Sequence, residues 1–178
     1  MTPSHILIAY STTDGHTLKI CNVIKQTLES LHHQVSLTPV TEMTGEELTP
    51  FDKIVVGASI RYGHHAPAVF DFIRRNQAAL DSKPNAFFSV NIVARKPNKN
   101  TPATNPYLRK FLRRINWKPK HLGVFAGKLN YPIYSFFDRL MIRFIMLITH
   151  GPTDPSTVVE FTDWEAVETF ARTVAALE

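Results

Sequence analysis

The sequence has little cysteine and no long apolar run, and both absences limit what the protein can be. Cys21 is the only cysteine among 178 residues, so the chain forms no internal disulfide, and we expect a reducing compartment, the cytoplasm. The amino terminus, MTPSHILIAY, lacks the basic segment and apolar core of a signal peptide. With 44% hydrophobic and 20% charged residues, the composition predicts one globular domain over residues 1–178.

Acidic residues are absent from a long central stretch. The 56 residues between Asp81 and Asp138 contain no Asp or Glu but 11 Lys or Arg, although the formal net charge of the chain is only +5. This stretch includes a basic loop and helix expected at about 92–118. Such one-sided charge attracts anions, which include lipid headgroups, nucleic acid and acidic small molecules.

The most apolar segment, YPIYSFFDRLMIRFIMLITH at residues 131–150, follows this basic stretch and predicts an inserted helix at about 132–150. Asp138, Arg139 and Arg143 interrupt it, so its longest apolar run is far shorter than the roughly 20 residues that span a bilayer. The charges form a narrow stripe on an otherwise apolar helix. Periodicity alone leaves three interpretations, which are a helix in a membrane interface, a helix packed on a sheet, and a helix in a dimer interface.

Strands and helices are predicted to alternate along the chain. Short apolar runs predict strands at 5–10, 34–40, 53–59, 85–91 and 121–127. Helical spacing predicts helices at 17–31, 67–80 and 107–115, and Thr162-Asp163-Trp164-Glu165 predicts the capping box of a last helix. This order implies a parallel sheet covered on both faces, in which ligands bind beyond the carboxyl ends of the strands.

The loop after the first strand, YSTTDGHT at residues 10–17, is rich in hydroxyl groups. Its Ser and Thr side chains can donate to phosphate oxygens, Gly15 allows close approach, and the following helix directs free N–H groups at an anion. The loop matches neither G-x-x-x-x-G-K-S/T nor G-x-G-x-x-G, so it does not favour a nucleoside triphosphate or a dinucleotide. An ordinary capped turn is the alternative.

The motif Tyr10-x-Thr12-x-x-Gly15-x-Thr17, with Cys21 and Ile24 further along the helix, resembles the FMN phosphate loop of flavodoxins. The resemblance implies a flavodoxin-like doubly wound sheet of five parallel strands in the order 2-1-3-4-5, with an extra apolar helix after strand five. Asp14 departs from the family pattern, because the family commonly has a hydroxyl or small residue at this position, and a carboxylate repels a phosphate unless it turns outward. The FMN-binding residues that the resemblance implies follow three strands, and they are Ser11, Thr12, Thr13, Asp14, Gly15, His16, Thr17, Ser59, Ile60, Arg61, Tyr62, Gly63, Ser89, Val90 and Asn91.

Several longer blocks, namely GASIRYGHH, SVNIVARKPNKNTP, RKFL, YPIYSFFDRLMIRFIM and FTDWE, make the resemblance more specific. Together they resemble the menaquinone-dependent protoporphyrinogen IX dehydrogenases of bacterial haem synthesis. This resemblance implies oxidation of protoporphyrinogen IX to protoporphyrin IX with FMN, and transfer of electrons to a membrane quinone, menaquinone or ubiquinone. A quinone acceptor favours the membrane interpretation of the apolar helix, so we expect peripheral association with an anionic surface at the inner face of the cell membrane.

The resemblance also guides the choice of substrate-binding residues. The two propionates of the substrate suit Arg95, Lys96 and Lys99, with Arg109 or Lys110 as further partners. In the loop after the third predicted strand, Tyr62 could stack on the flavin ring and Arg61 could stabilise negative charge on reduced flavin. Hydride transfer needs positioning more than an acid or base, so no catalytic side chain is predicted. No metal site is predicted, because His64 and His65 have no companion ligands at metal spacing.

Three other functions are compatible with parts of the sequence. A flavodoxin-like NAD(P)H:quinone reductase would share the FMN loop, and so would a simple electron-transfer flavoprotein, although the basic charge and the extra helix disfavour the latter. RKFLRRINWKPK could instead be a phosphate-contacting helix of a nucleic-acid-binding protein, which bound FMN would exclude. The sequence does not determine the oligomeric state.

Overall fold

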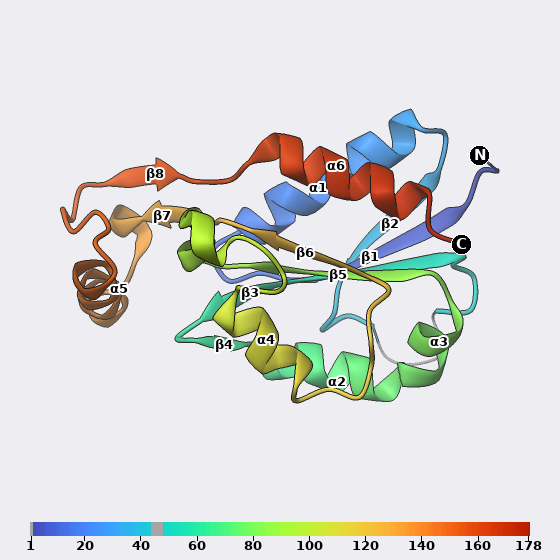
Figure 1. Cartoon of the computed structure of the whole chain (residues 1–178), viewed down its shortest axis with the longest axis horizontal. Helices are drawn as coiled ribbons and strands as arrows, with labels where there is room; N and C mark the ends of the chain where they lie inside the picture. Colours follow the sequence, from blue (N-terminus) through green and yellow to red (C-terminus); the bar gives the residue numbers. More distant parts are fainter. Residues whose placement is uncertain (1, 44–47) are drawn as a thin grey trace.

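The computed structural model describes residues 2–43 and 48–178. Its central sheet has five parallel strands in the order β2-β1-β3-β5-β6 (Figure 1). Their bounds are His5–Ser11 for β1, Gln34–Pro39 for β2, Lys53–Arg61 for β3, Asn85–Val90 for β5 and His121–Phe125 for β6. The predicted order 2-1-3-4-5 is confirmed, and the numbering differs only because a two-residue strand, β4 (His64–His65), pairs antiparallel with β3.

Helices cover both faces of the sheet because successive strand residues point to opposite sides. In β1, Ile6 and Ile8 pack beneath α1 (His16–Ser30) and α6 (Trp164–Ala175), while Leu7 and Ala9 face the other layer. That other layer holds α2 (Pro67–Arg75), α3 (Gln77–Ser82) and α4 (Pro106–Leu112) (Figure 1). All four of these β1 side chains are fully buried, as expected for a parallel sheet with two apolar faces.

Two helix boundaries differ from the sequence prediction. The helix expected at 67–80 is divided at Asn76, whose backbone N–H and side-chain amide both donate to the carbonyl of Phe72. The last helix is capped by Asp163, which accepts from the N–H of Ala166, and not by Thr162. The Thr162 hydroxyl donates instead to the carbonyl of Ala126.

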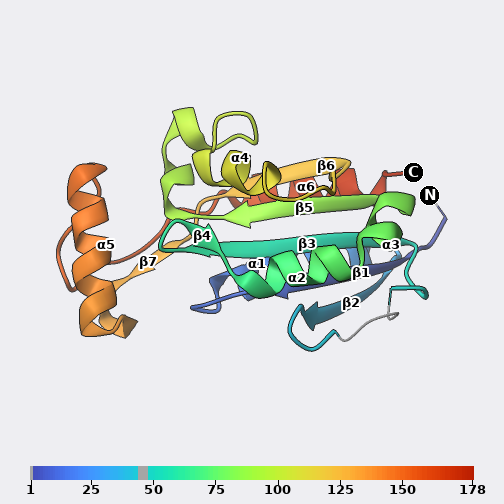
Figure 2. The ribbon, with the colours of Figure 1, turned by 90° about the horizontal axis from the view of Figure 1, so that it is seen from below.

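The chain after β6 forms a separate projection, here called the insertion segment (residues 128–160). An antiparallel pair, β7 (Lys128–Asn130) and β8 (Val158–Glu160), connects it to the sheet. Its helix α5 (Phe136–Ile148) runs across the strand direction beyond the carboxyl ends of the strands (Figures 1 and 2). A small core of its own stabilises it, made of Leu129, Tyr131, Tyr134 and Met146.

The helix α5 is shorter than the predicted 132–150, and its ends have identifiable causes. Ser135 caps its first turn by accepting from the N–H of Asp138, and a one-turn 3-10 helix, η3 (Tyr131–Ile133), precedes it. After Ile148 the chain leaves the helix, and His150 has a positive φ of 55°. Within the described part of the chain, no helix combines the length and the apolar character needed to cross a membrane.

Candidate functional site

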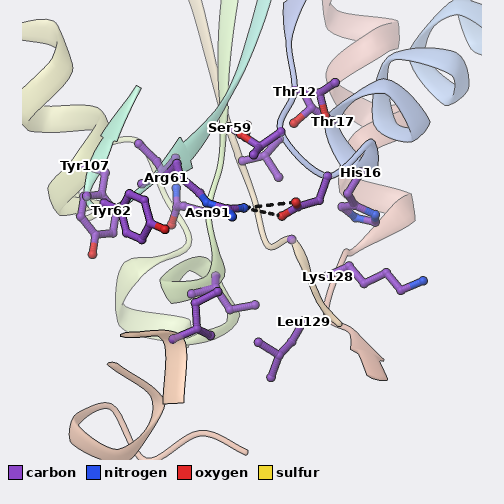
Figure 3. A pocket seen from close by; sticks show the side chains of 18 of the residues that line it. Thr12, His16, Thr17, Ser59, Arg61, Tyr62, Asn91, Tyr107, Lys128 and Leu129 are labelled. Carbon is purple, nitrogen blue, oxygen red and sulfur yellow. Dashed lines mark hydrogen bonds and ion pairs between the residues drawn. The ribbon is translucent and has the colours of Figure 1, made fainter. Parts of the chain in front are cut away.

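A cleft opens at the carboxyl ends of β1, β3, β5 and β6, where ligands bind in doubly wound sheets. It contains about 890 Å³ of empty space when its open mouth is included. Thr12, Thr17 and His16 lie on its α1 side, and Tyr62 and Tyr107 lie on the opposite side (Figure 3). Most of the residues predicted to bind a cofactor therefore share one cavity.

The loop between β1 and α1 has the features of an anion site. Gly15 adopts a left-handed conformation with φ of 81°, which other residues rarely adopt, and the Thr12 hydroxyl accepts from its N–H at 3.1 Å. No side chain in the described ranges caps the N–H groups at the start of α1. The Thr17 hydroxyl is 1% exposed and has no hydrogen-bond partner among the described residues. These donors fit the phosphate of a nucleotide such as FMN.

Asp14, the residue that departs from the flavodoxin pattern, is paired with a cation. Its two carboxylate oxygens accept from one terminal nitrogen of Arg61 at 2.9 and 3.1 Å. The other terminal nitrogen of Arg61 donates to Asp138 of α5 at 2.7 Å. The shared guanidinium beside Asp14 therefore reduces the repulsion between this carboxylate and an anion in the loop.

A strained hairpin places Tyr62 at the mouth of the cleft. Tyr62 and Gly63 join β3 to β4, and both have positive φ values, 50° and 78°, as a tight antiparallel turn requires. Tyr62 is 53% exposed, and the Arg61 guanidinium lies 5.5 Å from its ring centroid. An exposed aromatic ring held in a strained turn suits the stacking of a flat ligand.

Asn91 forms the base of the cleft and is held by a buried polar network. Its amide donates to the Ser89 hydroxyl at 3.2 Å, and its oxygen accepts from the N–H of Ala94 and from the amide of Asn105. His65 lies 3.0 Å from the same hydroxyl, and burial lowers its pKa to about 3, so the imidazole is neutral at neutral pH. Ser89 thus lies behind the wall and orients Asn91, which lines the cleft.

Comparison with known proteins identifies the family. Residues 7–156 match the flavodoxin domain family. The structure resembles oxidised flavodoxin 2 from Bacillus cereus with a TM-score of 0.58 at 22% identity, over 97% of this chain and 98% of that one. A protein of Escherichia coli named protoporphyrinogen IX dehydrogenase (quinone) is 44% identical over 171 residues, which are 96% of this chain and 94% of the relative.

The chain belongs to this family of flavodoxin-fold protoporphyrinogen IX dehydrogenases. A relative from Leishmania major with the same name is 45% identical over 172 residues, 96% of this chain and 74% of that protein. The resemblance inferred from the sequence is therefore confirmed, and so is the flavodoxin-like fold.

In this flavodoxin-fold chain, the basic residues predicted to bind propionates do not line the cleft. Arg95 is half-buried and donates to the carbonyl of Ile92 and to both oxygens of Thr149 at the end of α5, at 3.0 to 3.1 Å. Burial lowers its pKa, although the guanidinium remains charged. The remaining four candidates also lie outside the cleft wall, and they are Lys96, Lys99, Arg109 and Lys110. No three His, Cys, Asp or Glu side chains gather as metal ligands in the described ranges.

Sequence reasoning missed Ile92 within the third loop and the part of the cleft wall that comes from outside these three loops. Two signals were available, because Gly127 follows the fifth strand and Tyr107 begins the basic helix beside the fourth-strand loop. The insertion segment gave no local signal that it folds back over the sheet edge. The missed lining residues are Ile92, Tyr107, Gly127, Lys128, Leu129, Tyr134, Ile142 and Ile145.

Proposed function

We propose that this chain binds FMN in the cleft, oxidises protoporphyrinogen IX to protoporphyrin IX, and passes the electrons to a membrane quinone. The names of the relatives support the substrate and the acceptor. The observation that carries the cofactor assignment is the buried, unpartnered Thr17 hydroxyl beside the uncapped start of α1. A nucleotide phosphate there would complete the hydrogen bonding of both.

Each part of the cleft has a separate task in this proposal. Thr12, Thr17 and the N–H groups of α1 hold the phosphate, while Tyr62 and Asn91 orient the flat ring system. FMN, when bound, supplies the two-electron acceptor that takes a hydride from the porphyrinogen. Removal of six electrons from each porphyrinogen requires three such rounds, so the cleft has to release electrons to the quinone between them.

The side of the cleft formed by the insertion segment is mainly apolar, although Lys128 and Tyr134 also line it. Leu129, Ile142 and Ile145 line this side and exclude water from the part of the cleft next to the proposed FMN-binding loops. A bulky apolar macrocycle or a quinone ring gains hydrophobic contact on such a wall, whereas a charged nicotinamide nucleotide does not. Orientation against this wall, and not an acid or base, is what the side chains contribute to the reaction.

The proposal includes contact with an anionic membrane surface through α5. The helix turns Asp138 and Arg139 toward the protein and leaves its apolar side chains exposed, with Phe137 at 79% exposure. Exposed Arg143 lies on the same helix, and the acid-free basic stretch precedes it, so the charge complements anionic headgroups. The exposed apolar residues of α5 are Phe136, Phe137, Leu140, Met141, Phe144, Leu147 and Ile148.

An anaerobic turnover experiment tests the proposed reaction. FMN-loaded protein is mixed with protoporphyrinogen IX, with and without menaquinone, and porphyrin fluorescence is followed. We expect multiple turnovers only when the quinone is present. Absence of porphyrin together with rapid reduction of the flavin by NADPH would refute the proposal and favour a quinone reductase.

A further inference from the structure

The helix α5 is attached to the flavodoxin body at its two ends by arginines. Arg61, at the end of β3, donates to Asp138 in the first turn of α5, and Arg95, after β5, donates to Thr149 at its carboxyl end. Between these ends, the outward face of the helix is exposed. The inner face of α5 packs through Met146 into the small core of the insertion segment, with Ile92 against it, and the two arginines add charge-assisted attachments to this apolar contact.

The attachment through Arg61 also includes the phosphate loop. One guanidinium nitrogen bonds Asp138 at 2.7 Å and the other bonds both oxygens of Asp14, so one cation serves two carboxylates from distant segments. Asp138 is only 16% exposed and also accepts from the Ser135 hydroxyl at 2.8 Å. Charge-assisted bonds of this kind are stronger than neutral ones, and the planar fork of Arg suits two acceptors better than Lys does.

We propose that Arg61 is a positioning residue that docks α5 against the phosphate loop and so couples cofactor binding to the position of the helix. Ile142, one turn after Asp138, lies in the cleft wall, so the docking of α5 determines the position of that part of the wall. Without Arg61, Asp14 and Asp138 lose their shared cation and repel each other, and this repulsion moves α5 away from the loop. The coupling to the cofactor rests on the proposed FMN binding, whereas the docking itself does not.

Amide hydrogen exchange of α5 tests the docking in the protein without cofactor. We expect Asp138→Asn and Arg61→Gln to raise the exchange rates of α5 amides by about fivefold, the factor for roughly 1 kcal/mol from a partly buried charged pair. Asp71→Asn is the matched control, because Asp71 pairs with Arg74 at the same 2.7 Å on the exposed surface of α2. Amides of β1 report whether each variant is folded. Unchanged α5 exchange in both folded variants would overturn the proposal.

A second substitution separates charge repulsion from a general loss of structure. In the Arg61→Gln background, Asp14→Asn removes one of the two opposed carboxylates, so α5 exchange should return toward the wild-type rate. Arg61→Lys should give an intermediate rate, because a single ammonium cannot reproduce the fork. If Asp14→Asn makes exchange faster still, the repulsion argument is wrong.

The coupling is measured by repeating the exchange with FMN present. By linkage, FMN should slow α5 exchange in the wild type and slow it less in Arg61→Gln. Equal protection by FMN in both proteins would refute the coupling. If flavin fluorescence shows that the wild type binds no FMN, the proposed cofactor fails, and the cofactor-free comparison still decides the docking.

Discussion

Replacement of Thr17 by Val should raise the thermal stability of the cofactor-free protein and weaken its binding of FMN. The Thr17 hydroxyl is 1% exposed and has no hydrogen-bond partner in the part of the chain that the structure describes. Burial of an unpaired polar group costs roughly 1–3 kcal/mol. Val has nearly the same shape without the hydroxyl, so the substitution should remove this cost from the free protein.

The expected changes in Tm and in the Kd for FMN follow from the hydrogen bonding of the Thr17 hydroxyl. Taking the lower end of the cost, about 1 kcal/mol, a chain of this size should gain about 2–4 °C in the Tm of the cofactor-free protein. In the complex the hydroxyl donates to a phosphate, and a hydrogen bond to a charged group contributes roughly 1.5–3 kcal/mol. Thr17→Val should therefore raise the Kd for FMN by about 10-fold to 100-fold.

Thermal unfolding of the cofactor-free protein and titration of flavin fluorescence measure the two effects. Thr27→Val is a suitable control, because Thr27 lies on the same helix but donates to the carbonyl of Val23, far from the loop. It should leave the Kd for FMN unchanged. A Thr17→Val protein that is less stable and binds FMN normally would refute the reasoning, since the hydroxyl would then have a structural role.

Three further predictions concern the membrane face, the buried histidine and the sheet. Serine at both Phe144 and Ile148 should abolish sedimentation with anionic liposomes while FMN stays bound, whereas Val158→Ser, an exposed apolar control outside α5, should not. Burial lowers the pKa of His65 to about 3, so the unfolded chain binds its proton first as pH falls below the ordinary 6.5. The free energy of unfolding of the wild type should thus fall by up to about 1.4 kcal/mol per pH unit between pH 6.5 and about pH 3. Urea unfolding at several pH values should show a weaker pH dependence for His65→Gln, and an equal pH dependence would contradict a buried, neutral His65. Gly57→Ala would place a methyl group against the Phe88 ring and should cost about 1–3 kcal/mol in urea unfolding, and a normal midpoint would contradict this packing argument.

The binding of ligands at the carboxyl ends of parallel strands explains which cofactor-binding residues could be predicted from the sequence. Thr12, Arg61 and Asn91 are far apart in the sequence but line one cleft, because the carboxyl ends of neighbouring parallel strands share an edge. This reasoning does not tell at which residue a strand ends and the cleft begins. Ser89 is fully buried one residue before the end of β5, where it bonds His65 and Asn91 and does not line the cleft.

The presence of many basic side chains was easier to predict from the sequence than the directions in which they point. The acid-free stretch indicated an anion-binding region, but composition does not tell where a flexible side chain points. Arg95 directs its donors at Thr149 on α5, 54 residues further along the chain. The position of that acceptor depends on how the β7–β8 pair returns to the sheet, and no local pattern encodes it.

By itself, the sequence determined the alternation of strands and helices and the hydroxyl-rich loop, because hydrophobic periodicity and residue types at fixed spacing are local properties of a chain. The strand order and the family came from the resemblance of its motifs to those of known proteins. Only the tertiary structure decided that Arg61 joins Asp14 to Asp138, and that Ile142 and Ile145 complete the cleft wall. These contacts join segments up to 77 residues apart, so they depend on the direction in which the insertion segment packs against the sheet edge.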